Sequence, residues 1–156
     1  MKDLNSMRLT FPSHSVNEGF ARSAVAGFAA QLDPTLEELG DIKTAVSEAV
    51  TNCIVHAYPD TVGDVTLSCS IREGGVLEVR VRDRGCGIAD VKAARAPMYT
   101  TGGPDRSGMG FTIMESFMDE VEISSVVGIG TKVIMKKQIK KEEKDEIIKE
   151  ENALVN

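Results

Sequence analysis

The sequence of 156 residues has no tryptophan, only 4% aromatic residues and no long apolar run. A membrane-spanning helix needs about 18 or more consecutive apolar residues. The first stretch, MKDLNSMRLTF, also lacks the apolar segment that marks a secretory signal. These absences predict a cytoplasmic protein with no membrane partner.

Cysteine is scarce, and positive charge is outnumbered by negative charge. The three cysteines, Cys53, Cys69 and Cys86, are odd in number and form no CxxC pair, so neither a disulfide framework nor a zinc site is expected. The net charge is −6, with no basic stripe and no RNP-type aromatic pattern, which argues against direct nucleic-acid binding. Proteins or small molecules are therefore the expected partners.

Hydrophobic residues make up 42% of the sequence, which is ordinary for a globular protein. The length suits one domain with one core. Alternation of apolar and polar residues predicts strands, and apolar spacings of three and four predict helices. The predicted strands are residues 7–11, 65–71, 77–83, 121–125 and 131–135, and the predicted helices are residues 16–32, 35–57 and 111–118. Strands 65–71 and 77–83 are expected to form an antiparallel hairpin.

One apolar row of the first helix is predicted to face the core because its members recur every four residues. The row consists of Val16, Phe20, Ala24, Phe28 and Leu32. Between residues 88 and 110, a mixture of Pro, Gly, Thr and Ser predicts a long loop, and loops of this length tend to be functional. A single domain over residues 1–137 is expected, followed by a charged, solvated tail at 138–156.

Asp83 has an unusual place at the end of the strand VLEVRVRD, because it continues the inward parity of the apolar residues. A buried carboxylate without a partner is too costly to keep. Asp83 is therefore paired, exposed by fraying at the strand end, or a group that awaits a ligand. Thr131 is a second polar residue with inward parity, at the start of the last strand.

Glu48 and Asn52 are four residues apart in the helix predicted over 35–57, so their side chains share one face. For such a pair alone, an ordinary solvated helix face is the more common explanation, and this alternative stays open. The motif DRGCG (83–87) follows a strand, and its glycines allow a sharp turn and close approach of a ligand. The motif SGMG (107–110) opens a helix, where free N–H groups suit a phosphate.

Together and in this order, the motifs resemble the four ATP-binding boxes of the GHKL superfamily, which includes gyrase, Hsp90, histidine kinases and MutL. The N box is matched by Glu48 and Asn52, the G1 box by Asp83, Gly85 and Gly87, the G2 box by Gly108 and Gly110, and the last box by Gly130 and Thr131. The resemblance implies an α/β two-layer sandwich, the GHKL (Bergerat) ATP-binding fold. In this fold a mostly antiparallel mixed sheet is covered on one face by helices.

The resemblance also implies the cofactors ATP/ADP and Mg²⁺. Asp83 would accept the adenine amino group, Thr131 would help to hold the same ring edge, and Asn52 would bind Mg²⁺. Glu48 would accept or orient the proton of the group that receives the phosphate. Residues 88–107 would form the ATP lid, in which Arg106 and Ser107 are hypothesised to meet the γ-phosphate.

A single module of this size is most similar to the anti-sigma-factor serine kinases of sporulating bacteria. The similarity includes MRLTFPS, SEAVTNCIVHAY, RSGMGFTIME and GTKV. It implies a homodimer that, with ATP, holds a sporulation sigma factor away from RNA polymerase and phosphorylates a serine on an anti-anti-sigma protein. Two alternatives stay open: a non-catalytic, ATP-gated binding module, and the related kinase of the general stress response.

Overall fold

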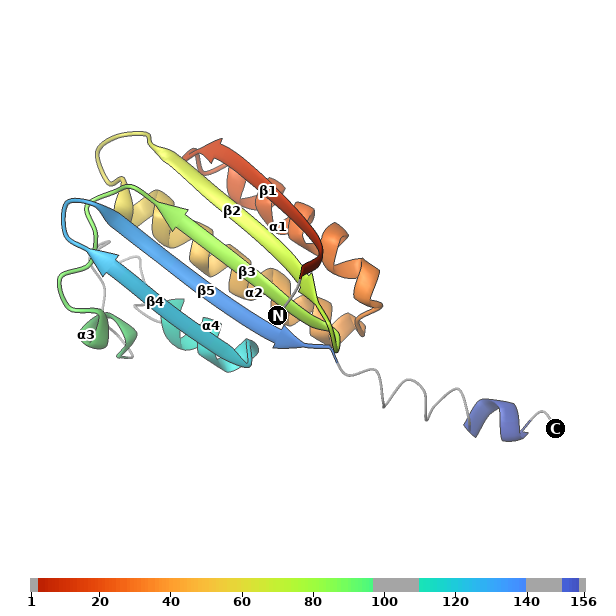
Figure 1. Cartoon of the computed structure of the whole chain (residues 1–156). Coiled ribbons are helices and arrows are strands. Elements are labelled where there is room, and N and C mark those ends of the chain that lie inside the picture. The colour runs from red at the N-terminus through yellow and green to blue at the C-terminus, as the bar shows by residue number, and fades with distance from the viewer. Residues whose placement is uncertain (1–2, 97–109, 140–149, 155–156) are drawn as a thin grey trace.

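The computed structural model describes residues 3–96, 110–139 and 150–154 (Figure 1). Its elements are β1 (Asp3–Pro12), α1 (Asn17–Ala29), the 3-10 turn η1 (Ala30–Leu32), α2 (Leu36–Asn52), the π-helical turn η2 (Cys53–Ala57), β2 (Asp64–Arg72), β3 (Val76–Asp83), α3 (Val91–Arg95), α4 (Gly110–Phe117), β4 (Glu120–Val126) and β5 (Gly130–Gln138). Residues 150–154 are also helical. The predicted strands and long helices are confirmed, with shifts of a few residues at their ends.

The five strands form one sheet in the order β1-β2-β3-β5-β4. All four strand pairs are antiparallel, so the mostly antiparallel sheet is confirmed, and the described strands include no parallel pair. Short turns join β2 to β3 and β4 to β5, and such turns connect antiparallel neighbours only. Helices α1, α2 and α4 lie on one face of this sheet, so the two-layer α/β architecture is confirmed (Figure 1).

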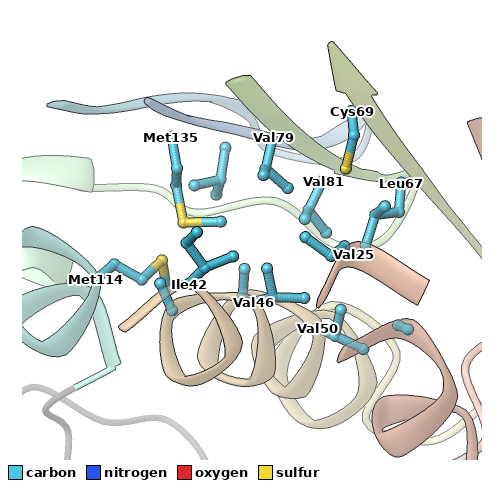
Figure 2. Close-up of a cluster of buried hydrophobic side chains, with 14 of the residues drawn as sticks. Val25, Ile42, Val46, Val50, Leu67, Cys69, Val79, Val81, Met114 and Met135 are labelled. Atoms are coloured by element: carbon cyan, nitrogen blue, oxygen red, sulfur yellow. The ribbon is translucent and has the colours of Figure 1, made fainter. Parts of the chain in front are cut away.

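The hydrophobic core fills the space between the sheet and the helices (Figure 2). The sheet contributes Leu67, Cys69, Val79, Val81 and Met135, and the helices contribute Val25, Ile42, Val46, Val50 and Met114. Helix α2 passes through the middle of this layer, and a capping box fixes where it begins. Thr35 Oγ1 accepts the Glu38 N–H at 3.1 Å, and the Glu38 carboxylate accepts the Thr35 N–H at 2.9 Å.

The prediction for the inward face of α1 was wrong in its first half, although Leu32, the last residue of the predicted row, is buried. Ala21, Val25 and Ala29 are fully buried, whereas Phe20 is 55% exposed and Val16, which precedes the helix, is 78% exposed. The buried row has the same four-residue spacing as the predicted row and is displaced from it by one residue, which is about 100° around the helix axis. The spacing alone therefore did not decide which of two adjacent rows faces the core, and the row with the smaller side chains makes the contact.

The sheet face opposite the helices carries a buried carboxylate, Glu78, which is 3% exposed. The sequence parity places Glu78 on the polar side of β3, and the structure adds that neighbouring cations cover it. Arg72 binds its Oε2 at 2.8 Å and Arg80 binds the same atom at 3.0 Å. A buried carboxylate is tolerable because these two guanidinium groups donate to it.

Strand β5 extends to Gln138, and Ile139 is 1% exposed, so the packed region continues two residues beyond the expected boundary at 137. Ile139 N–H donates to the Gly75 carbonyl at 3.0 Å. Of the lid predicted at 88–107, residues 88–96 are described and include α3, whereas 97–109 lie outside the described residues. None of the helices in the described part of the chain has the length and hydrophobicity required to cross a membrane.

Candidate functional site

The two inward-facing polar residues of the sequence meet in one cross-strand row. Asp83, the last residue of β3, lies opposite Thr131 of β5, and Thr131 lies opposite Ser125 of β4. On its other side the row continues through Val65 of β2, the partner of Asp83, to Phe11 of β1. Residues directly opposite each other on one sheet face lie within side-chain reach, so register alone brings these groups together.

Asp83 is 5% exposed, and donors surround its carboxylate. Its Oδ1 accepts the Gly85 N–H at 3.0 Å and the Thr131 N–H at 3.2 Å. The Cys53 thiol also hydrogen-bonds to the Asp83 side chain. A carboxylate offers about four acceptor positions, so Asp83 has capacity for a further donor from a ligand.

The segment that follows α2 contacts Asp83, because Cys53, the first residue of η2, directs its thiol to the Asp83 side chain. Burial raises the pKa of the Cys53 thiol well above its usual range, and the nearby Asp83 charge raises it further, so Cys53 stays protonated. Tyr58 follows η2; its hydroxyl donates to the Asp64 carbonyl at 2.8 Å and accepts the Arg84 N–H at 2.7 Å. Burial also raises the pKa of Tyr58, so its hydroxyl keeps the proton it donates.

Residues 84–88, which we call the G1 loop, are attached to the fold through their backbone. Besides Arg84 and Gly85, Cys86 donates its N–H to the Ala57 carbonyl at 3.1 Å, and Ile88 donates to Ser125 Oγ at 2.7 Å. The Gly128 N–H donates to the Cys86 carbonyl at 2.9 Å. The G1 loop is therefore a fixed wall beside Asp83.

Two glycines are required for this attachment. A Cβ on Gly85 would lie 2.2 Å from the Ala57 carbonyl oxygen, which is shorter than any normal contact. Gly87 has a φ of +77°, a backbone conformation that other residues rarely adopt, and its Cβ would also lie 2.4 Å from the Val126 carbonyl oxygen. Both G1-box glycines named from the sequence thus have a structural requirement.

Ser125 is a site residue that the sequence reasoning missed. Its hydroxyl lies 2.8 Å from Thr131 Oγ1 and also accepts the Ile88 N–H. A signal was available, because Ser125 continues the inward parity of Val121 and Ile123, as Asp83 does in its own strand. The strand pairing needed to join it to Thr131 is not visible in the sequence.

Glu48 and Asn52 come together with Gly110 at the start of α4. A Cβ placed on Gly110 would lie 3.2 Å from Asn52 Oδ1 and 3.3 Å from Glu48 Oε2. The two side chains are therefore on one face of α2, as predicted, and that face is turned toward the G2-box glycine. Since Asn52 precedes Cys53, which contacts Asp83, this cluster adjoins the Asp83 row.

The remaining predicted site residues, Arg106, Ser107 and Gly108, lie outside the described residues. Gly130 adjoins Thr131, and a Cβ there would lie 2.2 Å from the Asp83 carbonyl oxygen. Within residues 3–96, 110–139 and 150–154, no group of three His, Cys, Asp or Glu side chains could hold a metal ion.

The arrangement has two chemically different ends. At one end, a buried acceptor, Asp83, is held beside the G1 loop and can accept an amino donor. At the other end, a carboxylate and a carboxamide, Glu48 and Asn52, face the first residue of α4. The N-terminus of a helix attracts anions. A nucleotide has this combination of a flat base and an anionic chain, and it fits the residues present.

Comparisons with known proteins agree with this chemistry. Residues 11–137 match the family described as histidine kinase-like ATPase domain. The chain is 53% identical over 140 residues to the "Anti-sigma F factor" of Thermoanaerobacter sp. (strain X514), a match that covers 89% of this chain and 97% of the relative. It is 54% identical over 138 residues to the protein of the same name from Geobacillus kaustophilus (strain HTA426), with 88% and 94% covered.

Solved structures show the same fold at low identity. The structure of the RsbU and RsbW domains of Rv1364c from Mycobacterium tuberculosis superposes with a TM-score of 0.64 at 18% identity, over 86% of this chain and 32% of that one. The histidine kinase domain of the blue-light activated histidine kinase from Erythrobacter litoralis EL346 gives a TM-score of 0.54 at 23% identity, over 78% and 61%. At these identities the likeness supports the fold alone.

Proposed function

Because the chain belongs to the anti-sigma F factor family and contains a histidine kinase-like ATPase domain, we propose that it is an ATP-dependent anti-sigma factor and protein serine kinase. With ATP bound, as a homodimer, it would hold the sporulation sigma factor, sigma F, away from RNA polymerase. It would also inactivate the anti-anti-sigma antagonist by phosphorylating a serine on it. Because sigma F and RNA polymerase are its targets, the protein would act in the cytoplasm. It would do so as one domain followed by a charged tail.

The observation that carries the proposal is the pairing of two clusters along one helix. Asp83 with Thr131 would receive the base beside Cys53, directly after α2. Asn52, the residue before Cys53, faces Gly110 of α4 together with Glu48, which lies one helical turn earlier. A nucleotide bound at Asp83 would extend its phosphates along this path toward Gly110. Glu48 and Asn52 would then lie beside the phosphates, where the phosphoryl group is transferred.

In the proposed transfer, the serine hydroxyl oxygen forms a bond to the γ-phosphorus of ATP while the bond to the bridging oxygen breaks and ADP leaves. Glu48 accepts the proton from the serine hydroxyl, which requires only an ordinary carboxylate within hydrogen-bond reach. The Asn52 side-chain oxygen would hold Mg²⁺, which supplies neutralisation of phosphate charge. Arg106, Ser107 and Gly108 are proposed to contact the phosphates.

The test is transfer of label from γ-labelled ATP, with Mg²⁺, to candidate anti-anti-sigma proteins. We expect a labelled serine with the wild type. Glu48→Ala should lower the transfer rate by about 10²-fold or more, the usual contribution of a general base, while ATP still binds. Asp83→Asn should lose ATP binding. Glu37→Ala is the matched control, since Glu37 is an exposed acid on the same helix.

Binding of sigma F is measured in parallel, with ATP and without nucleotide. If the chain binds ATP and holds sigma F but labels no partner serine, it is a non-catalytic ATP-gated binder and the kinase assignment is wrong. If it labels a partner of another circuit and ignores sigma F, it acts in the general stress response instead. Loss of transfer in Glu37→Ala as well would remove the specific assignment of Glu48.

A further inference from the structure

Ser125 is the β4 member of the Asp83 row, and its hydroxyl also contacts the G1 loop. Its Oγ accepts the Ile88 N–H at 2.7 Å, lies 2.8 Å from Thr131 Oγ1 and donates to the Gly130 carbonyl at 3.1 Å. The residue is half-buried on β4, directly opposite Thr131. One hydroxyl therefore joins three backbone or side-chain groups around the proposed base site.

The number of protons on Ser125 determines how Thr131 is oriented. A serine hydroxyl has one proton and two lone pairs. Its proton goes to the Gly130 carbonyl, which is an acceptor only, and one lone pair receives the Ile88 N–H. For the third contact to be a hydrogen bond, Thr131 must donate its own proton to Ser125.

With its proton directed to Ser125, the Thr131 oxygen is left as an acceptor. Its cross-strand partner Asp83 is also an acceptor, since donors already occupy its Oδ1. Two neighbouring acceptors attract an amino group, which carries two N–H donors, and they disfavour a carbonyl oxygen at the same position. Whether an amino group or a carbonyl is favoured beside Asp83 and Thr131 thus depends on the direction of the Thr131 hydroxyl proton.

We propose that Ser125 is a specificity-determining residue that acts through Thr131. It holds the Thr131 hydroxyl as an acceptor, so that the site selects a purine nucleotide with an exocyclic amino group over one with a carbonyl at that position. The inference rests on the proposed nucleotide binding. It makes Ser125 a positioning residue, because Ser125 reaches the base only through Thr131.

The test is calorimetric binding of ATP and of inosine triphosphate, which carries a carbonyl where adenine carries the amino group, both with Mg²⁺. Wild type should prefer ATP. Ser125→Ala frees the Thr131 hydroxyl to rotate and donate, so ATP affinity should fall about tenfold, the effect of one hydrogen bond, while affinity for inosine triphosphate changes by no more than about twofold. Ser125→Thr, which keeps the hydroxyl, should restore the preference.

Ser124→Ala is the matched control, since Ser124 is exposed on the same strand with the opposite parity, and it should behave as wild type. If thermal unfolding shows that Ser125→Ala does not fold, Ser125→Cys replaces it, because a thiol is a much weaker acceptor than a hydroxyl and should lower the ATP preference in the same direction by a smaller factor. An unchanged preference in the substituted chain overturns the inference, and so does an equal loss for both nucleotides, which would indicate a structural effect. A wild type that binds neither nucleotide would overturn the proposed function itself.

Discussion

At the residue scale, Asp83 shows how a carboxylate can be buried before any ligand arrives. Two backbone N–H groups and the Cys53 thiol donate to it, and all three come from elements distant in sequence or from the turn that follows. Each donor compensates part of the cost of removing the charge from water. Strand β3 therefore ends on a buried carboxylate that is stable and can still accept a hydrogen bond from a ligand.

The buried thiols predict a pH effect on stability. Burial raises the pKa of Cys69 from 9.0 to about 12. Between these two values the unfolded chain has lost the Cys69 proton while the folded chain keeps it, so stability is fully present below pH 9 and falls as the pH rises toward 12. Cys53, whose pKa is also raised, changes stability in the same direction.

We expect the free energy of unfolding, measured in urea at pH 8, 9.5 and 10.5, to decrease with pH less steeply in Cys69→Ala than in wild type. The difference between the two slopes should approach about 1.4 kcal/mol per pH unit, the value for one proton. Cys86→Ala is the control for the loss of one exposed thiol. Equal slopes for Cys69→Ala and wild type would contradict the prediction.

At the element scale, the π-helical turn η2 joins α2 to the G1 loop. It places the Cys53 thiol against Asp83 and leaves the Ala57 carbonyl to accept the Cys86 N–H. A regular α-helix would direct these groups differently, and π turns of this kind are frequent at functional sites. The close approach of η2 to the loop depends on the missing side chain of Gly85.

Gly85→Ala and Gly40→Ala should have opposite effects. The Gly85 Cβ would meet the Ala57 backbone, so the loop must move, and we expect a loss of about 2 kcal/mol in stability and at least about tenfold in ATP affinity. Gly40 lies in α2 with open space around it, so alanine should add about 0.5–1 kcal/mol through helix propensity. Chemical unfolding and calorimetry measure both.

One result for the Gly85→Ala variant would contradict this prediction. If Gly85→Ala keeps wild-type ATP affinity, the G1 loop is not held against η2 as the structure indicates. Gly40→Ala should leave ATP affinity unchanged, because its site is far along the helix from Cys53. A loss of affinity in that control would mean that the assay responds to α2 in general.

At the scale of the whole molecule, sheet pairing and burial reach almost the same residue within the described segment 110–139. Gln138 is the last residue of β5 and Ile139 is the last buried residue there, while residues 150–154 are exposed at every position. Lys137 also ties this strand to the helices, since its Nζ lies 3.6 Å from an Asp41 carboxylate oxygen. The residues that stabilise the domain therefore extend to 139.

A chain that ends at Ile139 should unfold in one transition within about 2 °C of the full chain, since surface changes usually alter stability by less than 0.5 kcal/mol. A chain that ends at Lys136 loses the buried Ile139 and the Lys137 pair, and it should lose about 2–4 kcal/mol. Calorimetric unfolding of both chains is the measurement. A large loss already in the longer chain would show that the tail contributes to the fold.

The sequence by itself determined the elements and which residues of a strand face inward. Alternation in VLEVRVRD placed Asp83 on the buried side, and the four-residue spacing placed Glu48 and Asn52 on one helix face. These features follow from local geometry, since a strand repeats every two residues and a helix every 3.6. The resemblance of the ordered motifs to a known superfamily then indicated the nucleotide site.

Only the tertiary structure decided how those residues combine. The register that joins Asp83, Thr131 and Ser125 depends on pairing between strands far apart in sequence, and no local pattern encodes it. The same holds for α1, whose core-facing side is set by the close packing of Ala21 and Ala29 rather than by its larger apolar residues. Periodicity determines a face, but contacts between distant segments determine which partner that face meets.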